Sequence, residues 1–152
     1  TMRSALGGVL VQDRDNRTDS AEDLHTVTAT IPTPAQVDDM LFAAKVVKHC
    51  RSNAIVLAHA RTLCAAGVGQ TSRVDSLRQA IAKAKAFGMS LDGAVMASDA
   101  FFPFGDCVQI AHEAGITAVI QPGGSIRDHE SVEYCDAHGL AMSMTGIRHF
   151  RH

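Results

Sequence analysis

The sequence predicts an α/β domain in which short buried strands alternate with amphipathic helices. Four segments carry clear helix start and stop signals, and apolar runs of strand length lie between them. The last three runs, GAVMA, ITAVI and LAMSM, are nearly continuous hydrophobic segments separated by helices, which is typical of parallel strands buried on both faces of a sheet. A chain of 152 residues that is 46% hydrophobic is long enough for one domain with its own core.

The first two helices are predicted from their N-terminal caps. In TPAQVDDMLFAAKVVKHC, Thr33 is the expected N-cap, a proline follows it, and Gln36 completes a capping box. In SRVDSLRQAIAKAKAFG, Ser72 and Asp75 repeat this device, and the helix is expected to stop at Gly88. Apolar residues at helical spacing should face the core: Val37, Met40, Leu41, Ala44, Val47, Val74, Leu77, Ile81 and Ala84.

The other two helices and the earlier strands are predicted in the same way. DCVQIAHEAG predicts a helix from Asp106 to Gly115, and SIRDHESVEYCDAHG predicts one from Ser125 to Gly139, with Asp128 as the capping-box partner. GGVLVQ, LHTVTAT, AIVLA and TLCAAGV are the expected earlier strands. The charged stretch between the first two, residues 12–23, predicts a solvated loop.

Composition narrows the possible function classes. A net charge of −2 and a pI near 6.4 provide no basic surface for a nucleic-acid backbone. The apolar runs are too short to cross a bilayer and no signal peptide is evident, so we expect a cytoplasmic protein without a membrane partner. The four cysteines are widely spaced and are expected to be reduced core thiols. Cys135 and His138 lack a second pair of ligands, so no metal is expected.

Three loops that follow consecutive strands predict a ligand pocket. ASDAFFPFGD follows GAVMA, QPGGS follows ITAVI, and TGIRHFRH follows LAMSM. Ligands of open α/β sheets bind at the carboxyl ends of strands, so these aromatic, glycine-rich and cationic loops indicate a site for a flat, anionic small molecule. Each feature also has a structural explanation, because the phenylalanines could fill the core, Asp106 and Ser125 could cap helices, and Arg148 and Arg151 could solubilise the C-terminus.

Five segments resemble the C-terminal portion of the AICAR transformylase/IMP cyclohydrolase family, the bifunctional PurH enzymes of purine biosynthesis. They are SNAIV, GQTSRVDS, ASDAFFPFGD, IQPGGSIRD and TGIRHFRH, and the similarity extends over essentially the whole chain. The resemblance implies a single domain, residues 1–152, that is the second cytidine-deaminase-like half of the AICAR transformylase domain. It implies a three-layer α/β sandwich with a mostly parallel or mixed sheet. The HxE and PCxxC motifs of the deaminase zinc site do not occur, so no zinc is implied.

The resemblance implies formyl transfer from 10-formyltetrahydrofolate to AICAR, giving FAICAR and tetrahydrofolate. It assigns AICAR contacts to Asn53, Arg73, Phe101 and Arg148. Asn53 would lie near the reacting amine, where a carboxamide can hydrogen-bond the substrate or the developing oxyanion. Phe101 would orient the imidazole, and the Arg148 guanidinium would bind the 5′-phosphate through two parallel hydrogen bonds.

The folate contacts implied by the resemblance are Val74, Asp106, Ser125 and Ile126. Asp106 is suited to accept hydrogen bonds from the amino and ring N–H groups of a pterin. The same oxygens would serve a helix cap, so for Asp106 and Ser125 the sequence leaves capping and ligand binding open.

The resemblance also implies what this chain lacks. The family takes its proton acceptor from a Lys-His pair in the first half of the transformylase domain, which is absent here, as is the cyclohydrolase domain. Lys48 and His49 are not that pair, because they end a helix and precede CRSN rather than the family's Asn-Pro-Cys-Gly type of turn. We therefore expect a half enzyme completed by the remainder of the family chain and by a homodimer. The alternatives are a non-catalytic nucleotide or folate binding module and a dimerisation domain.

Overall fold

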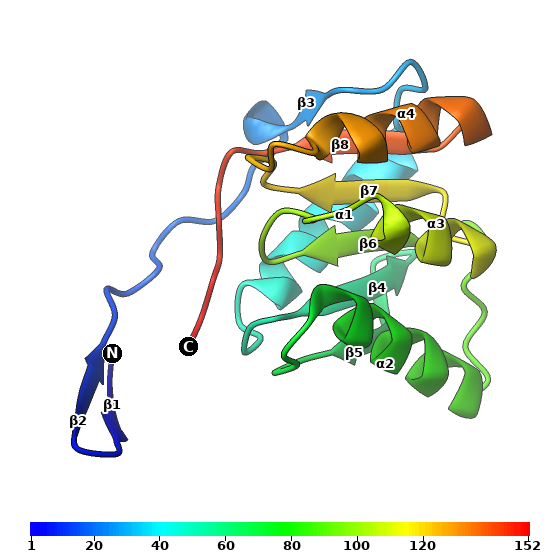
Figure 1. Cartoon of the computed structure of the whole chain (residues 1–152). Coiled ribbons are helices and arrows are strands. Elements are labelled where there is room, and N and C mark those ends of the chain that lie inside the picture. The colour runs from blue at the N-terminus through cyan, green and yellow to red at the C-terminus, as the bar shows by residue number, and fades with distance from the viewer.

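The computed structural model describes residues 1–152 and shows a six-stranded mixed sheet with helices on both faces, together with a separate two-stranded hairpin (Figure 1). The predicted α/β class is therefore confirmed. In chain order the elements are β1 (Met2–Ala5), β2 (Gly8–Val11), the 3₁₀ turn η1 (Ala21–Asp23), β3 (His25–Thr26), α1 (Pro34–Val47), β4 (Ile55–His59), β5 (Thr62–Gly67), α2 (Arg73–Ala86), β6 (Val95–Ser98), α3 (Asp106–Glu113), β7 (Ala118–Gln121), α4 (Asp128–His138) and β8 (Ala141–Met144). None of these helices has the length and hydrophobicity needed to cross a membrane.

The order of the strands brings five loops to one edge of the sheet. The order is β3-β8-β7-β6-β4-β5, with β6, β7 and β8 parallel to one another. Strand β4 is antiparallel to β6 and β5, so Ile55 pairs with both Ser98 and Gly67. The start of β4 therefore lies beside the carboxyl ends of β5, β6, β7 and β8. We call this region, residues 51–53, 68–72, 99–105, 122–127 and 145–152, the loop edge.

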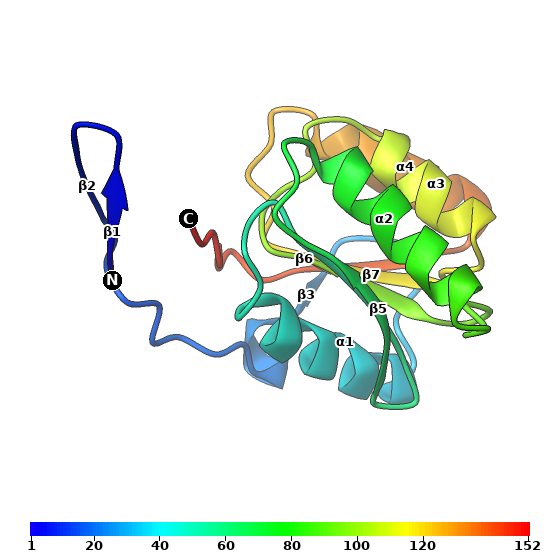
Figure 2. The ribbon, with the colours of Figure 1, turned by 90° about the horizontal axis from the view of Figure 1, so that it is seen from below.

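The helices cover the sheet from both sides. Figure 2 shows α1 on one face and α2, α3 and α4 on the other. Alternate residues of β4 enter two separate cores: Ile55 and Leu57 pack beneath α2, α3 and α4, whereas Val56 and Ala58 pack against α1. Every residue of β6 and β7 is buried, as predicted for parallel strands between two helical layers.

The first two predicted helix caps are present. The Thr33 hydroxyl accepts from the Gln36 amide at 3.2 Å, and the Gln36 side chain accepts from the Thr33 amide at 2.8 Å. The Ser72 hydroxyl accepts from the Asp75 amide at 3.1 Å. Gly88, just beyond α2, has a φ of +66°, which ends the helix as predicted.

Neither Asp106 nor Ser125 occupies the N-cap position predicted for it, although Asp128 accepts from the Ser125 amide as predicted. Asp106 is the first helical residue of α3 and follows Gly105, which occupies the N-cap position. Helix α4 begins at Asp128 rather than Ser125. Gly123 and Gly124 have positive φ values of 72° and 102°, so the chain turns here before a helix can start. The Asp128 carboxylate accepts from the amides of this turn, and the Ser125 hydroxyl accepts from the Arg127 amide.

The N-terminal segments also differ from the prediction. GGVLVQ forms β2 but pairs only with β1, outside the main sheet. In LHTVTAT only His25 and Thr26 pair with β8; beyond them the Thr28 hydroxyl accepts from the Met142 amide at 2.9 Å. Residues 12–23 are irregular apart from one 3₁₀ turn, yet Asp19 is buried, so this segment is not simply a solvated loop.

Candidate functional site

A buried ion pair lies at the centre of the loop edge. The Arg73 side chain is 5% exposed at the start of α2, and its Nη1 pairs with the fully buried carboxylate of Asp99. The same nitrogen donates to the Ser98 hydroxyl at 3.0 Å. Arg73 Nη2 donates to Asn53 Oδ1 at 2.8 Å, so two residues assigned by the resemblance are in direct contact.

The carboxamide of Asn53 makes three hydrogen bonds. Besides accepting from Arg73, it donates through Nδ2 to the carbonyls of Gln70 at 3.0 Å and Thr71 at 3.2 Å. Both N–H groups of the amide are thus engaged within the protein. A substrate oxygen would have to replace one of these carbonyls, and the longer bond to Thr71 is the easier one to replace.

Asp99 joins the segments of this site and was missed by the sequence analysis. Its side chain accepts from Arg73 and from the Ser52 hydroxyl, and its backbone carbonyl accepts from the His149 amide at 3.0 Å. It therefore links α2, the segment before β4 and the C-terminal residues. The only available signal was its position before the phenylalanines in ASDAFFPFGD, because burial of a carboxylate beside an arginine has no local sequence pattern.

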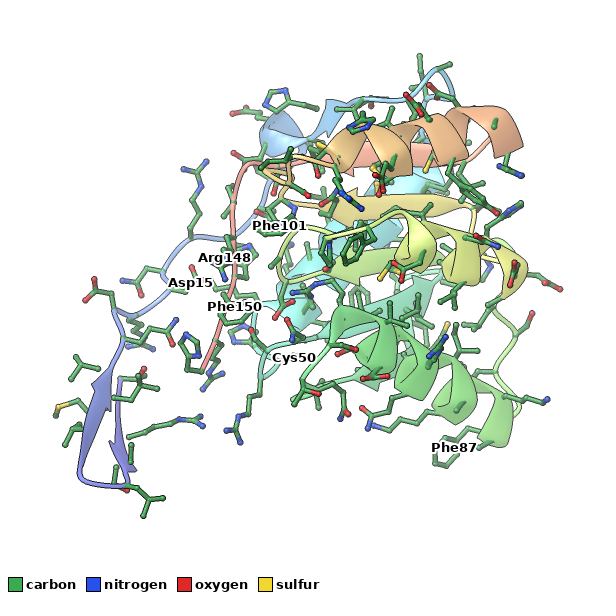
Figure 3. The ribbon with its side chains drawn as sticks, viewed as in Figure 1. Asp15, Cys50, Phe87, Phe101, Arg148 and Phe150 are labelled. Carbon is green, nitrogen blue, oxygen red and sulfur yellow. The ribbon has the colours of Figure 1, made fainter.

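The three phenylalanines after Asp99 have different environments. Phe102 is fully buried in the core, so the structural explanation holds for this residue. Phe101 and Phe104 remain 37% and 50% exposed. Figure 3 shows Phe101 and Arg148 on the side of the sheet formed by the loop edge. The Arg127 guanidinium lies 5.0 Å from the centre of the Phe104 ring and connects two of the loops.

Of the four residues assigned to folate, Ser125 and Ile126 lie in the loop edge, whereas Val74 and Asp106 lie next to it in the first turns of α2 and α3. Val74 is half-buried in the first turn of α2. The Asp106 carboxylate is exposed at the start of α3, and one of its oxygens accepts from the Cys107 amide at 2.9 Å. Ser125 is half-buried and Ile126 is 98% exposed in the turn before α4. Neither Asp106 nor Ser125 occupies the N-cap position, although each side chain accepts from a backbone amide at the start of its helix.

The C-terminal tail, residues 146–152, crosses this edge. Arg148 is exposed, with its guanidinium 4.3 Å from the centre of the Phe150 ring. The Arg151 amide donates to the Ser52 hydroxyl at 2.8 Å, and its guanidinium donates to the His49 carbonyl at 3.0 Å. His149 points inward and contacts residues near the N-terminus. A polar cavity of about 650 Å³ lies between residues 12–16, the end of α1 and tail residues 149–151.

Lys48 and His49, expected in the last turn of a helix, lie at and just beyond the end of α1. Lys48 is the C-cap of α1, and its ammonium donates to the Arg17 carbonyl and, at 3.1 Å, to the Thr18 hydroxyl. His49 follows the helix and accepts from Arg151 through its carbonyl. These contacts tie the end of α1 to the N-terminal segment and to the tail.

The cysteines are unpaired and their thiols resist ionisation. Burial raises the pKa of Cys107 and of Cys135 to about 12, and it also raises the pKa of Cys50 and Cys64. Nearby carboxylates add to this, with Asp106 acting on Cys107. All four are free, which confirms the expected thiols, although Cys50 is only half-buried. No group of three or more His, Cys, Asp or Glu side chains is arranged to hold a metal ion.

The fold is an α/β domain whose loop edge contains the candidate site, and comparison with known proteins identifies its family. The sequence pattern of the AICARFT/IMPCHase bienzyme family matches residues 1–83. The bifunctional purine biosynthesis protein PurH of Bacteroides thetaiotaomicron is 63% identical over 150 residues, which are 99% of this chain and 30% of that protein. PurH of Aquifex aeolicus is 54% identical over 151 residues, covering 99% of this chain and 29% of that protein.

The chain therefore belongs to the AICARFT/IMPCHase bienzyme family, whose matched relatives are purine biosynthesis proteins. It spans about 30% of the length of these relatives. A solved structure of a Thermotoga maritima diaminohydroxyphosphoribosylaminopyrimidine deaminase/5-amino-6-(5-phosphoribosylamino)uracil reductase aligns with 68% of this chain and 33% of that chain, at 21% identity and a TM-score of 0.48. At that score the likeness supports no inference about this chain.

Proposed function

We propose that this chain is part of an AICAR formyltransferase and corresponds to the second half of the transformylase domain, with a cytidine-deaminase-like three-layer fold. The reaction is formyl transfer from 10-formyltetrahydrofolate to the 5-amine of AICAR. The observation that supports this best is the meeting of Asn53, Arg73 and the C-terminal tail around Asp99 in a chain of this family. Ring closure to IMP is assigned to a part of the relatives that this chain does not include.

The AICAR side of the proposed site is formed by four residues. Arg148 is exposed and free to bind the 5′-phosphate, and Phe101 offers a partly exposed ring to the imidazole. Asn53 lies beside the reacting amine, where it exchanges its bond to the Thr71 carbonyl for one to substrate. Arg73 keeps the Asn53 carboxamide in place.

The folate side uses the starts of three helices. Asp106 has a carboxylate oxygen to spare for a pterin N–H group, while Val74 and Ile126 provide apolar surface. Ser125 completes this wall from the glycine turn. Amide groups at helix starts also favour the negative charge that a folate carries.

The proposed enzyme is completed by other polypeptide. AICAR's amine is a poor nucleophile, so transfer needs a proton acceptor, and we assign that group to the remainder of the longer family chain. A homodimer and a cytoplasmic location are part of the proposal. The exposed apolar hairpin β1–β2 supports the homodimer, because such surface is usually covered by a partner.

The direct test is formyl transfer followed by tetrahydrofolate absorbance. The chain is assayed alone and then mixed with the Bacteroides thetaiotaomicron PurH from which the matching 150 residues have been removed. Activity only in the mixture supports a shared site. Activity of the chain alone would show that the proton acceptor is here, with Lys48 and His49 as the first candidates. Ligand binding without turnover in either sample favours a binding module, and binding of neither ligand favours a dimerisation domain.

The two sides of the site predict opposite selectivity. Arg148→Ala should weaken AICAR binding by roughly tenfold or more with folate binding unchanged, because a charge-assisted bidentate contact is lost. Asp106→Ala should weaken folate binding well beyond AICAR binding. Titration calorimetry of this chain with each ligand measures both. Equal losses for Asp106→Ala, or an unchanged AICAR affinity for Arg148→Ala, would contradict the assigned roles.

A further inference from the structure

The C-terminal tail is joined to the N-terminal segment by a histidine between two carboxylates. The His149 side chain is 3% exposed, and its Nδ1 lies 2.6 Å from Asp15 Oδ2 while its Nε2 lies 3.0 Å from Asp19 Oδ2. An ionised carboxylate only accepts hydrogen bonds, so both ring nitrogens must donate. Only the imidazolium form of His149 carries a proton on each nitrogen.

Asp19 depends on this histidine more than Asp15 does. The Asp19 side chain is 3% exposed, and its other oxygen, Oδ1, is buried without a hydrogen-bond partner. A buried carboxylate that loses its only cation is strongly destabilised. The Asp15 side chain is 35% exposed and also accepts from the Arg17 amide at 3.1 Å. Of the two carboxylates that bind His149, Asp19 is therefore buried and Asp15 is partly solvated.

The contacts of the tail depend on where His149 lies. The His149 amide donates to the Asp99 carbonyl at 3.0 Å, and two residues later the Arg151 amide donates to the Ser52 hydroxyl. Both acceptors belong to the loop edge. Arg148 lies between these anchors and the glycine at the start of the tail, so its position follows from theirs.

Other charged groups surround the three residues. Lys48, at the end of α1, is near enough to lower the pKa of Asp15 further, and the Asp99 carboxylate is already paired with Arg73. The remaining titratable or charged side chains on the adjoining cavity are Asp13, Arg14, His49 and Arg151.

The electrostatic effects of the three groups reinforce one another. Burial by itself would lower the pKa of His149, but its hydrogen bonds to Asp19 and Asp15 and their charges raise it above the usual 6.5. Burial would raise the pKa of Asp15, but the bond to His149 and its charge keep it below 3.8. By linkage, the His149 contribution is complete below pH 6.5 and is lost as the pH rises through its raised pKa. The Asp15 contribution is complete above pH 3.8 and is lost in stronger acid.

We propose that Asp15 and Asp19 clamp His149 in its protonated form and thereby position the C-terminal tail, including Arg148, and that the clamp opens as the pH rises. His149 is a positioning residue that acts on the site through the tail. The part of this proposal in which Arg148 binds AICAR rests on the proposed function. The clamp of His149 by Asp15 and Asp19 does not.

The clamp is tested on the full chain without any ligand. NMR titration should give His149 a pKa above 6.5, and Asp19→Asn should lower it. Amide protection in residues 148–152, normalised to the free peptide at each pH, should fall between pH 6 and pH 8.5. The fall should be about tenfold for each unit by which the clamp raises the His149 pKa. In His149→Gln, protection should be low throughout and independent of pH.

A matched variant separates the clamp from general effects of pH. His25→Gln removes an exposed histidine from β3 and should leave the pH dependence of the tail unchanged. A His149 pKa at or below 6.5, or equal protection of the tail at both pH values in the wild-type chain, would overturn the proposal.

AICAR affinity, measured on the same samples, distinguishes the two proposals. If both hold, the affinity declines with the same midpoint as tail protection, and His149→Gln weakens it at pH 6. If tail protection titrates while AICAR binds at no pH, the clamp stands and the proposed function fails. If AICAR binds and His149→Gln leaves its affinity unchanged, the clamp does not position Arg148.

Discussion

The hairpin β1–β2 and strand β4 contain similar apolar sequences but occupy opposite environments. The residues of AIVLA are completely buried, whereas Met2, Val9 and Val11 of the hairpin are 76%, 63% and 69% exposed. Strand β4 has a neighbour on each side and helices on both faces, while the hairpin pairs only with itself and projects from the domain (Figures 1 and 2). An apolar run thus predicts a strand, but it does not tell what covers that strand.

One face of the hairpin is free of charge. Met2 pairs with Val11 and Ser4 with Val9, and paired residues point to the same face. Arg3 and Leu10 lie on the other face. A two-stranded hairpin is marginally stable by itself, so this surface gains most if a partner covers it. The difference between the two regions is therefore one of partners rather than of local sequence.

The largest effect on stability is expected in the core of the domain. Phe102→Ala removes a fully buried ring and should destabilise the chain by about 3–5 kcal/mol. The matched variant Phe87→Ala truncates a ring that is 81% exposed and should change stability by less than about 0.5 kcal/mol. Denaturant unfolding measures both. Similar losses in the two variants would show that the core is not where this structure places it.

A comparable effect is expected at the buried ion pair. Arg73→Met leaves the Asp99 carboxylate without its cation and should cost about 3–5 kcal/mol in unfolding free energy. The double variant Arg73→Met, Asp99→Leu removes both charges and should recover a large part of that loss. If the double variant were as unstable as the sum of the two single variants, the coupling between these residues would be absent.

The smallest effect on stability is expected in the hairpin. Val11→Lys places a charge on an exposed position and should change unfolding free energy by less than about 0.5 kcal/mol. It should nevertheless reduce self-association measured by sedimentation equilibrium, because it interrupts the charge-free face. A wild-type chain that stays monomeric at every concentration would refute this use of the hairpin. Glu22→Gln, on an exposed residue of η1, changes the net charge by the same one unit and is the control.

The sequence located much of the candidate site, but it did not predict the contacts within that site. The order of strands and helices in the sequence correctly placed Phe101, Asp106, Ser125 and Arg148 at one edge, because parallel strands present their carboxyl ends together. The sequence left open whether Asp106 and Ser125 cap helices or bind a ligand, and in the structure the N-cap positions belong to Gly105 and Arg127. The assigned ligand contacts of these residues remain predictions.

The sequence by itself determined the local elements and the α/β class. Caps such as Thr33 with Gln36, and the continuous apolar runs of β6 and β7, act over a few residues and leave a periodic pattern. Only the tertiary structure decided that Arg73 meets Asp99, that His149 lies between Asp15 and Asp19, and that the hairpin stands apart. The clamp joins groups 130 and 134 residues apart, and burial of such charges depends on the packing of the whole sheet rather than on any nearby sequence.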